Sequence, residues 1–260
     1  FDHIGAAMVN GMQTMLSCTV TFAEGCRLYH IGAKAFCGVS LVNLTILPQG
    51  EIEIGDYAFA GMSMLTTVNF EDSTSALTFG KGVLQGTGSL GNIVLPSRIR
   101  EISEEMFRNS AITGVTIGSS VTVIGKNAFA GCTGLVEIIF AEGCNIEIIP
   151  ESAFENVAAG TITIPKSVKV IESRAFAKVS ASEIIFEEGS VLTTIGDGAF
   201  TGSALVSISI PSSVTTLGKG VFEGAKKLTS VSLDGTALVN IPERTFTDCK
   251  KLKSFNVPNT

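Results

Sequence analysis

The stretch GSSVTVIGKNAFAGCTG (118–134) has the residue types of a loop that binds the phosphates of a nucleotide. In such a loop four residues separate two glycines, and a lysine and then a serine or threonine follow the second glycine. Here six residues separate Gly118 from Gly125, and Asn127 follows Lys126 where a hydroxyl would hold magnesium. The spacing therefore argues against nucleotide binding.

A second glycine-rich stretch, GTGSLG (86–91), matches the G-x-G-x-x-G pattern of dinucleotide-binding proteins letter by letter. That pattern binds a pyrophosphate where a strand precedes it and a long helix follows it. Here a short turn precedes the stretch, and residues 92–95 after it have the pattern of a short strand. We interpret the match as coincidental and expect no cofactor.

Residues that could act as acid–base or nucleophilic catalysts are few. The two histidines are His3, close to the first residue, and His30, which directly precedes the apolar Ile31. The sequence places no serine or cysteine partner beside either of them, and the G-x-S-x-G pattern of esterases is absent. The sequence therefore predicts that the protein is not an enzyme.

The glycine-rich stretches belong to a unit that recurs about every 22–25 residues, which is the signature of a solenoid. A phenylalanine marks most units, Leu84 takes its place once, and Val9 takes it in the first unit. An apolar residue, mostly isoleucine, lies five positions before each of these anchors. The marking phenylalanines are Phe36, Phe59, Phe107, Phe129, Phe154, Phe176, Phe200, Phe222 and Phe246.

Each unit ends in a short alternating stretch such as LVEIIF (135–140), rich in the residues that favour strands. Eleven such stretches, each too short to be stable alone, can pair in parallel about 4.8 Å apart. Around each phenylalanine, as in GKNAF (125–129), we expect one helical turn that a left-handed residue such as Gly131 ends. In four units other residues replace that glycine, namely Asn109, Asn156, Lys178 and Asp248.

The repeated pattern L-x-x-I-x-I-P-x-S-V-x-x-I-G-x-x-A-F-x-G-C-x-x-L resembles the BspA-like, or Treponema-type, leucine-rich repeats. SISIPSSVTTLGKGVFEGAKKLTSVSL (207–233) and VTIGSSVTVIGKNAFAGCTGLVEIIF (115–140) carry it best, and it covers essentially the whole chain. The resemblance implies an α/β fold: a right-handed curved solenoid of about eleven coils, with short parallel strands on the concave face and short helical turns on the convex side. It also implies a bacterial or protist cell-surface protein that adheres to host matrix proteins or other cells.

Cysteine usage argues against a structural metal site, because C-x-x-C pairs and zinc-ligand spacings are absent. Partners in a disulfide need Cα atoms within about 7 Å, whereas cysteines that share a repeat column lie five coils apart. We therefore expect most cysteines to be small buried side chains, while a Cys18–Cys26 pair in the irregular first coil stays open. The cysteines are Cys18, Cys26, Cys37, Cys132, Cys144 and Cys249.

Carboxylates recur directly after several predicted strands, at Glu24, Glu71, Asp72, Glu142, Glu187, Glu188 and Asp234. Strands of one type alternate along the stack, so these groups lie about 10 Å apart, too far to share one calcium ion. We interpret them as a solvated acidic edge, with weak calcium binding as the alternative.

The composition fits a folded chain of this kind. Apolar residues make up 45% of the 260 residues and charged residues 16%, which allows a continuous core. The net charge of −6 and the lack of a Lys/Arg stripe argue against a nucleic-acid partner. No apolar run reaches the roughly 18–20 residues that cross a bilayer, so we expect no membrane insertion by this segment.

We expect residues 1–260 to form a single leucine-rich-repeat solenoid domain. The chain opens with FDHIG and no initiator methionine, so we interpret it as a fragment of a longer surface protein. Both ends present a repeat without a polar cap, which predicts either end-to-end self-association or neighbouring residues that cover the ends.

Alternate residues of each predicted strand point away from the core, and this outward set on the concave face is the candidate binding surface. The strip is small, polar and nearly uncharged, except near its centre, where Ile139 and Ile185 each lie beside a glutamate. The candidate residues are Asn69, Asn92, Val94, Thr116, Glu137, Ile139, Thr163, Glu183, Ile185, Ser207 and Ser209.

These features favour a non-catalytic recognition or adhesion module, extracellular and either secreted or at the cell surface. Its partner would be a protein or glycan of the host or of a neighbouring cell. The alternatives are a structural spacer within a surface protein and an intracellular protein–protein scaffold. A solvent-exposed strand face that binds no partner would have the same composition, so this alternative stays open.

Overall fold

Two series of short parallel strands run along the computed structural model, which describes residues 3–4, 18–21, 29–46, 51–70, 76–88 and 90–256. The long series consists of β2 (Cys18–Thr21), β4 (Leu41–Ile46), β6 (Thr67–Phe70), β8 (Asn92–Val94), β10 (Gly114–Ile117), β12 (Glu137–Phe140), β14 (Thr161–Ile164), β16 (Glu183–Phe186), β18 (Ser207–Ser209), β20 (Ser230–Ser232) and β21 (Ser254–Asn256). The short series consists of β1 (His3–Ile4), β3 (His30–Ile31), β5 (Ile52–Ile54), β7 (Leu77–Phe79), β9 (Glu101–Ile102), β11 (Val123–Ile124), β13 (Ile148–Ile149), β15 (Val170–Ile171), β17 (Thr194–Ile195) and β19 (Thr216–Leu217).

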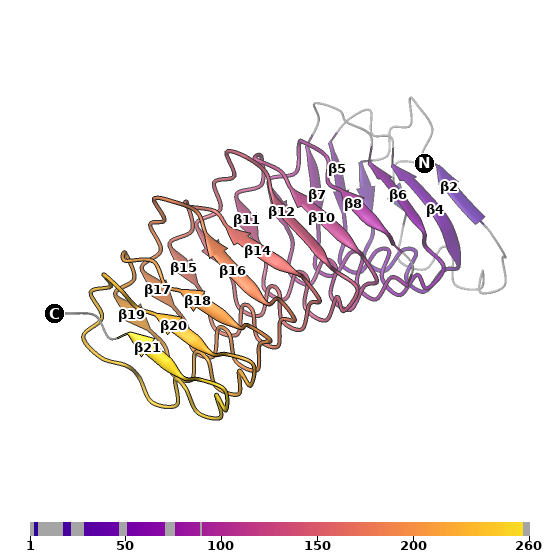
Figure 1. Cartoon of the computed structure of the whole chain (residues 1–260). Coiled ribbons are helices and arrows are strands. Elements are labelled where there is room, and N and C mark those ends of the chain that lie inside the picture. The colour runs from indigo at the N-terminus through magenta and orange to yellow at the C-terminus, as the bar shows by residue number, and fades with distance from the viewer. Residues whose placement is uncertain are drawn as a thin grey trace.

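The long strands lie side by side from β2 at one end of the molecule to β21 at the other (Figure 1). The paired strands are parallel and come from successive coils, with repeat-related residues opposite each other, as in Gly114↔Glu137 and Thr161↔Glu183. Side chains alternate between exposed and buried along a strand such as β14, because successive residues point to opposite faces. The eleven strands expected from the repeat are confirmed at their expected positions.

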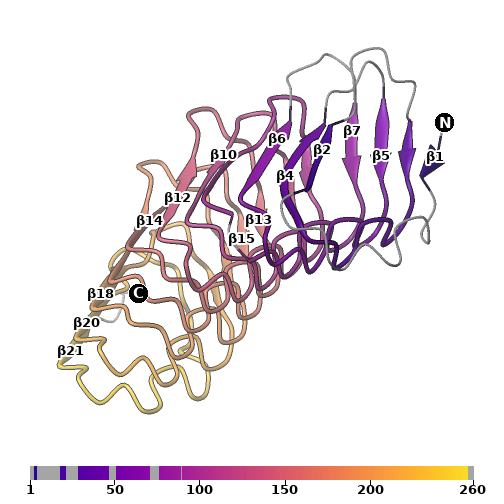
Figure 2. The same ribbon diagram turned by 90° about the vertical axis from the view of Figure 1, so that its right-hand side faces the viewer.

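The short strands form a second set of parallel ladders on another side of the coil (Figure 2). The last residue of each lies five positions before the anchor of its repeat, and most of these residues are buried, as Ile54 and Ile102 are. In the last coil Ile241 holds this position outside any strand and is 39% exposed. The sequence predicts the apolar column but not the strand, because two residues are too few to show alternation.

The segment around each phenylalanine, here called the turn run, was expected to be a helical turn, and this expectation is wrong. Within the turn run at 125–132, the N–H of Phe129 donates to the carbonyl of Ala153 in the next coil at 2.9 Å. The N–H of Ala130 donates to Asn127, three residues back, at 3.1 Å. Successive N–H groups donate alternately to a carbonyl of the next coil and to a carbonyl three residues back. They therefore do not make the i→i−4 bonds of an α-helix.

Two residues in each turn run have a left-handed backbone, four positions apart. The later one was expected, and it is confirmed at Gly38, Gly61, Gly86, Asn109, Gly131, Asn156, Lys178, Gly202, Gly224 and Asp248. The earlier one was missed, because residues of many types occupy it: Lys34, Tyr57, Gly82, Glu105, Asn127, Ser152, Arg174, Gly198, Gly220 and Arg244. A chain that turns left-handed every fourth residue cannot continue a right-handed helix.

The core is one continuous cluster of buried apolar side chains that runs through the coils. The rings from Phe107 to Phe246 stack from coil to coil, with centroids 5.2 to 5.8 Å apart. Leu84 is fully buried, so it fills the same column without adding a ring to the stack. The predicted anchors are therefore the centre of the core, and Phe246 near the end of the stack is partly buried.

The described residues form about nine turns of a parallel β-solenoid, rather than the eleven coils that the sequence predicted. The sequence-based count took each long strand as one whole coil. In the structure, nine complete turns join the short strands β1 to β19, so the difference arises at the ends of the stack. The expected α/β class is also wrong, since the described residues contain strands and turns but no helix. Accordingly, no helix within these residues is long and apolar enough to span a bilayer.

Candidate functional site

The stretch that resembles a phosphate loop is part of the frame of one coil. An added Cβ at Gly125 would lie 2.3 Å from the backbone nitrogen of Glu104, so glycine permits the close approach of two coils. The ammonium group of Lys126 donates to Glu151 Oε2 in the next coil at 3.0 Å. This bond is the main reason that the pKa of Lys126 is raised. Gly125 and Lys126 thus serve contacts between coils.

The second glycine-rich match, at 86–91, also has a structural role. Gly86 is the later left-handed residue of its turn run, and β8 rather than a helix follows the stretch, as expected. An added Cβ at Gly88 would lie 2.3 Å from the carbonyl oxygen of Ser63, again a close approach of two coils. The context of a dinucleotide site is therefore missing.

Of the two histidines, only His30 has a described side chain, and it contacts a carboxylate. His30 and Glu53 lie opposite each other in the β3–β5 pair, and their side chains approach to 3.3 Å at the surface. His3 lies in β1, and its side chain is not among those described. Within the described residues, no three His, Cys, Asp or Glu side chains are placed to hold a metal ion.

The carboxylates after the long strands are exposed where the structure describes them, at Glu142, Glu187, Glu188 and Asp234. Glu187 Oε2 accepts the backbone N–H of Lys166 at 2.9 Å, and Asp234 Oδ2 accepts the hydroxyl of Ser232 at 2.9 Å. Glu24, Glu71 and Asp72 lie outside the described residues. Weak calcium binding at this edge stays an untested alternative.

Four cysteine side chains are described, and all four are free thiols. Cys132 and Cys144 are buried as expected, Cys249 is partly buried, and Cys37 is exposed, which the sequence did not predict. The Sγ of Cys132 donates to the carbonyl of Phe107 at 2.9 Å, and burial raises the pKa of this thiol to about 11. The Cys18–Cys26 pair cannot be placed, because Cys26 lies outside the described residues.

Alkylation of the native protein at pH 8 should label Cys37 and spare Cys132. The thiolate is the reactive form, and a thiol with a pKa of about 11 is about 0.1% ionised at pH 8. Peptide mass spectrometry after brief iodoacetamide treatment should show modified Cys37, with Cys132 modified in denaturant alone. Equal labelling of both residues in the native protein would contradict this arrangement.

The outward side chains of the long strands form two rows, which together we call the long-strand face. Strand pairing aligns Gly114 with Glu137 in the first row and Thr116 with Ile139 in the second. The eleven candidate residues all belong to these rows; Thr116 is half-buried and the others are exposed. The structure thus directs the candidate side chains away from the core, and Val94, at 74% exposure, is the most open apolar one among them.

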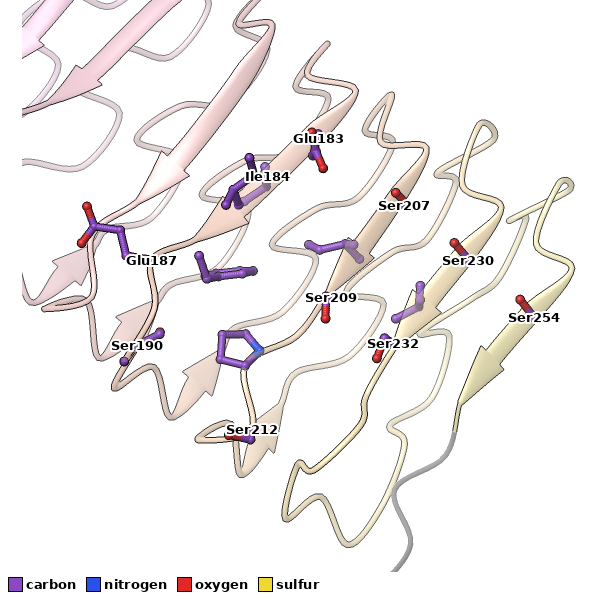
Figure 3. Close-up of a pocket in the computed structure, with 16 residues that line it drawn as sticks. Glu183, Ile184, Glu187, Ser190, Ser207, Ser209, Ser212, Ser230, Ser232 and Ser254 are labelled. Atoms are coloured by element: carbon purple, nitrogen blue, oxygen red, sulfur yellow. The ribbon is translucent and has the colours of Figure 1, made fainter.

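A hollow of about 630 Å³, which we call the serine hollow, opens on this face over β16, β18, β20 and β21 (Figure 3). Four candidates line it, namely Glu183, Ile185, Ser207 and Ser209. Strand pairing places Ser207, Ser230 and Ser254 in one row and Ser209 and Ser232 in the next. Paired strands lie about 4.8 Å apart, so the hydroxyls form a regular grid that begins beside Glu183 and Ile185.

A smaller hollow of about 430 Å³ lies over β6 and β8, and the candidates Asn69, Asn92 and Val94 line it. Glu137 and Ile139, which the sequence placed at the centre of the contact patch, line neither hollow. Thr116 and Thr163 also lie outside both. The structure therefore separates the candidates into two groups, with Glu137 and Ile139 on the face between them.

The candidate residues chosen from the sequence leave out part of the serine hollow. Its lining also includes Ser230, Ser232 and Ser254 on the strands, and Ser190 and Ser212 on the loops that follow β16 and β18. The signal was present as S-x-S at 207–209 and again at 230–232. Outward positions of three successive coils hold serines, which are smaller than the neighbouring Glu183 and Ile185. This difference in side-chain size produces the hollow.

Stacked coils, parallel ladders and a continuous apolar column define a solenoid repeat protein, a class that usually binds partners on an extended surface and does not catalyse reactions. The model of the family described as "BspA type Leucine rich repeat region" matches residues 18–136 and 147–260 in six copies. The chain therefore belongs to this leucine-rich-repeat family, and the resemblance drawn from the sequence is confirmed.

Two solved bacterial structures are similar to this chain. A leucine-rich repeat protein from Bacteroides ovatus is 27% identical with a TM-score of 0.74, over 92% of this chain and 63% of that one. A leucine-rich repeat protein from Eubacterium ventriosum is 25% identical with a TM-score of 0.58, over 93% and 72% respectively. The chain thus spans less than two thirds of the Bacteroides protein. No curated protein matches the chain.

Proposed function

We propose that residues 1–260 act as one extracellular recognition or adhesion module without catalysis, and that the long-strand face makes the contact. Membership of a bacterial leucine-rich-repeat family supports an interaction role. The surface location follows from what the family resemblance implies. The partner is a protein or a glycan of the host or of a neighbouring cell.

The serine hollow is the observation that carries this proposal. Its side chains stand on parallel strands whose register is fixed by pairing with their neighbours, so little motion is lost when a ligand binds. A serine hydroxyl both donates and accepts, so the grid can match many arrangements of polar groups on a ligand. Exposed Ile185 and the lining residue Pro211 add apolar contact beside the hydroxyls.

The charges around the serine hollow limit the kind of ligand. Glu183 and Glu187 are the charged residues that line it, and both are exposed. An acidic ligand would meet repulsion there, whereas a neutral or basic one would not. The proposal therefore favours a neutral glycan or a neutral to basic protein segment.

Filling the serine hollow should weaken binding to a partner found by screening immobilised matrix proteins and neutral glycans. The variant Ser209→Arg/Ser232→Arg places two long side chains in the second row of the grid, where both serines line the hollow. We expect Kd to rise at least about tenfold, as large groups exclude the ligand from the contact centre. Biolayer interferometry with the wild-type chain and the variant measures the change.

The matched control is Ala111→Arg/Thr133→Arg, which adds the same charge at two exposed positions outside the hollow. Its Kd should stay within about twofold of the wild-type value. Equal losses in both variants would point to charge alone and sink the assignment of the hollow. A wild-type chain that binds no member of the panel would favour the spacer alternative.

A further inference from the structure

Four lysines stack in pairs at one corner of the solenoid, between the turn runs and the start of the last two long strands. Lys226 and Lys227 precede β20, and Lys250 and Lys251 hold the same repeat positions before β21. The two coils are in direct contact, since the rings of their anchors Phe222 and Phe246 lie 5.8 Å apart. In the linear sequence a whole repeat separates the two pairs, so no basic cluster was predicted from the sequence.

These four lysines differ in their partners from four other lysines of the described chain. Lys81, Lys126, Lys169 and Lys219 each pair with a glutamate of a neighbouring coil at 2.6 to 3.0 Å. Lys226, Lys227, Lys250 and Lys251 are all exposed, and no carboxylate of the described residues lies within 4.0 Å of their ammonium groups. Like charges stacked one coil apart repel each other, and a bound anion would relieve that repulsion.

A cavity of about 310 Å³ adjoins the stacked lysines. Lys178, Lys226 and Lys227 line it together with Ser180 and Ser203. Lys178 makes a long contact of 3.6 Å with Glu155, so its charge is only loosely paired. Three lysines therefore line one small cavity, and their positive charge favours an anion there.

Ser203 supplies a second, independent indication of a ligand. Its side chain is 3% exposed, and its hydroxyl has no hydrogen-bond partner. Polar side chains at the same repeat position do have partners: Thr87 and Cys249 donate to backbone carbonyls, and Ser110 bonds to Cys132. A buried hydroxyl without a partner is costly, and rotation about χ1 would let it donate to an anion in the cavity.

We propose that this corner binds an anionic glycan that carries sulfate or carboxylate groups. One such group would occupy the cavity beside Ser203, and the next groups along the polymer would meet Lys250 and Lys251. Clusters of lysine are a known basis for heparin-like recognition. A nucleic acid is less suitable, because single strands need aromatic side chains for stacking, and the cavity lining holds none. This site lies apart from the serine hollow and does not depend on the function proposed for it.

The test uses a size-defined heparin oligosaccharide, the whole chain and isothermal titration calorimetry in 50 and 200 mM NaCl. Binding should weaken about tenfold or more between the two salt concentrations, because it displaces condensed counterions. The variant Lys226→Gln/Lys227→Gln/Lys250→Gln/Lys251→Gln should raise Kd at least about tenfold. The control Lys81→Gln/Lys126→Gln/Lys169→Gln/Lys219→Gln removes the same charge elsewhere and should change Kd less than about threefold.

The variant Ser203→Val tests whether heparin binding uses the cavity or only the charge of the lysines. Val157 and Val179 hold the same repeat position and are fully buried, so the variant should fold like the wild-type chain. We expect its Kd for heparin to rise about threefold. No heparin binding by the wild-type chain, or equal losses in both lysine variants, would overturn the proposal. Equal affinity for a neutral oligosaccharide of the same length, or for single-stranded DNA of the same charge, would overturn it as well.

Discussion

Phe154→Ala should lower the free energy of unfolding by about 4 kcal/mol, because it leaves a large cavity in the centre of the core. The ring of Phe154 is completely buried. It stacks on Phe129 at 5.2 Å and on Phe176 at 5.4 Å, and it meets the edge of Phe140 at 6.3 Å. No neighbouring coil can collapse into the space without breaking its own parallel ladder, so little relaxation is available. Urea denaturation followed by circular dichroism measures the loss.

The matched control is Phe154→Leu, because Leu84 fills the same column in the natural chain and is fully buried there. The smaller change in volume should cost about 1–2 kcal/mol. A loss below about 1 kcal/mol for the alanine variant would contradict the stack as the main core element. A leucine variant as unstable as the alanine variant would show that the ring itself, rather than filled volume, is required.

Gly125→Ala should destabilise the fold by about 3 kcal/mol, although alanine is a small and conformationally permitted residue. The φ of Gly125 lies outside the left-handed region, so the backbone gains no strain from a side chain. The loss comes from contact, since the new Cβ would lie 2.3 Å from Glu104 N and 2.6 Å from Ser103 C. The atoms involved are backbone atoms of the previous coil, so the two coils must separate.

Gly160→Ala is the control for this glycine, because an added Cβ there meets nothing within 4 Å and the backbone is not left-handed. Its free energy of unfolding should stay within about 1 kcal/mol of the wild-type value, or rise slightly as the unfolded chain loses freedom. The same urea titration compares the two variants. A neutral Gly125→Ala would mean that the coils are not as close at this point as the structure has them.

The repeat predicted the parts of the fold that recur in every coil. Apolar columns and alternating stretches placed the eleven long strands and the stacked anchors, because each coil must bury the same positions against its neighbours. The left-handed residue after each anchor was also predictable, since glycine, asparagine and aspartate mostly occupy it. Family membership followed from the same pattern.

The turn runs were predicted incorrectly, for a physical reason. The earlier left-handed position is occupied by Lys34, Tyr57 and Arg174 among others, residues that carry no preference for that backbone. They adopt it because Lys34 and Arg174 donate their N–H groups to carbonyls of the next coil, at 2.8 and 3.0 Å. Bonding between coils thus overrides local preference, and a single repeat read in isolation gives a helical turn instead.

The outward-facing residues of the candidate site were predictable from the sequence, but the shape of the surface that they form was not. Alternation along the strands gave the residues that point outward, such as Ile139 and Ile185. It could not show that Ile185 borders the serine hollow and Ile139 does not, because the hollow depends on side-chain size in three successive coils. The stacked lysine corner was missed for a similar reason, since neighbours in space are separated by a whole repeat in the sequence.

Hydroxyl-radical footprinting of the chain with a bound partner from the screen tests most directly whether the serine hollow carries recognition. Ile185 and Ile148 are equally useful probes, at 43% and 46% exposure, but Ile148 lies on the short strand β13. The proposed contact predicts that the partner lowers oxidation of Ile185 at least about threefold and leaves Ile148 unchanged. Protection of Ile148 with unchanged oxidation of Ile185 would contradict the long-strand face as the binding surface.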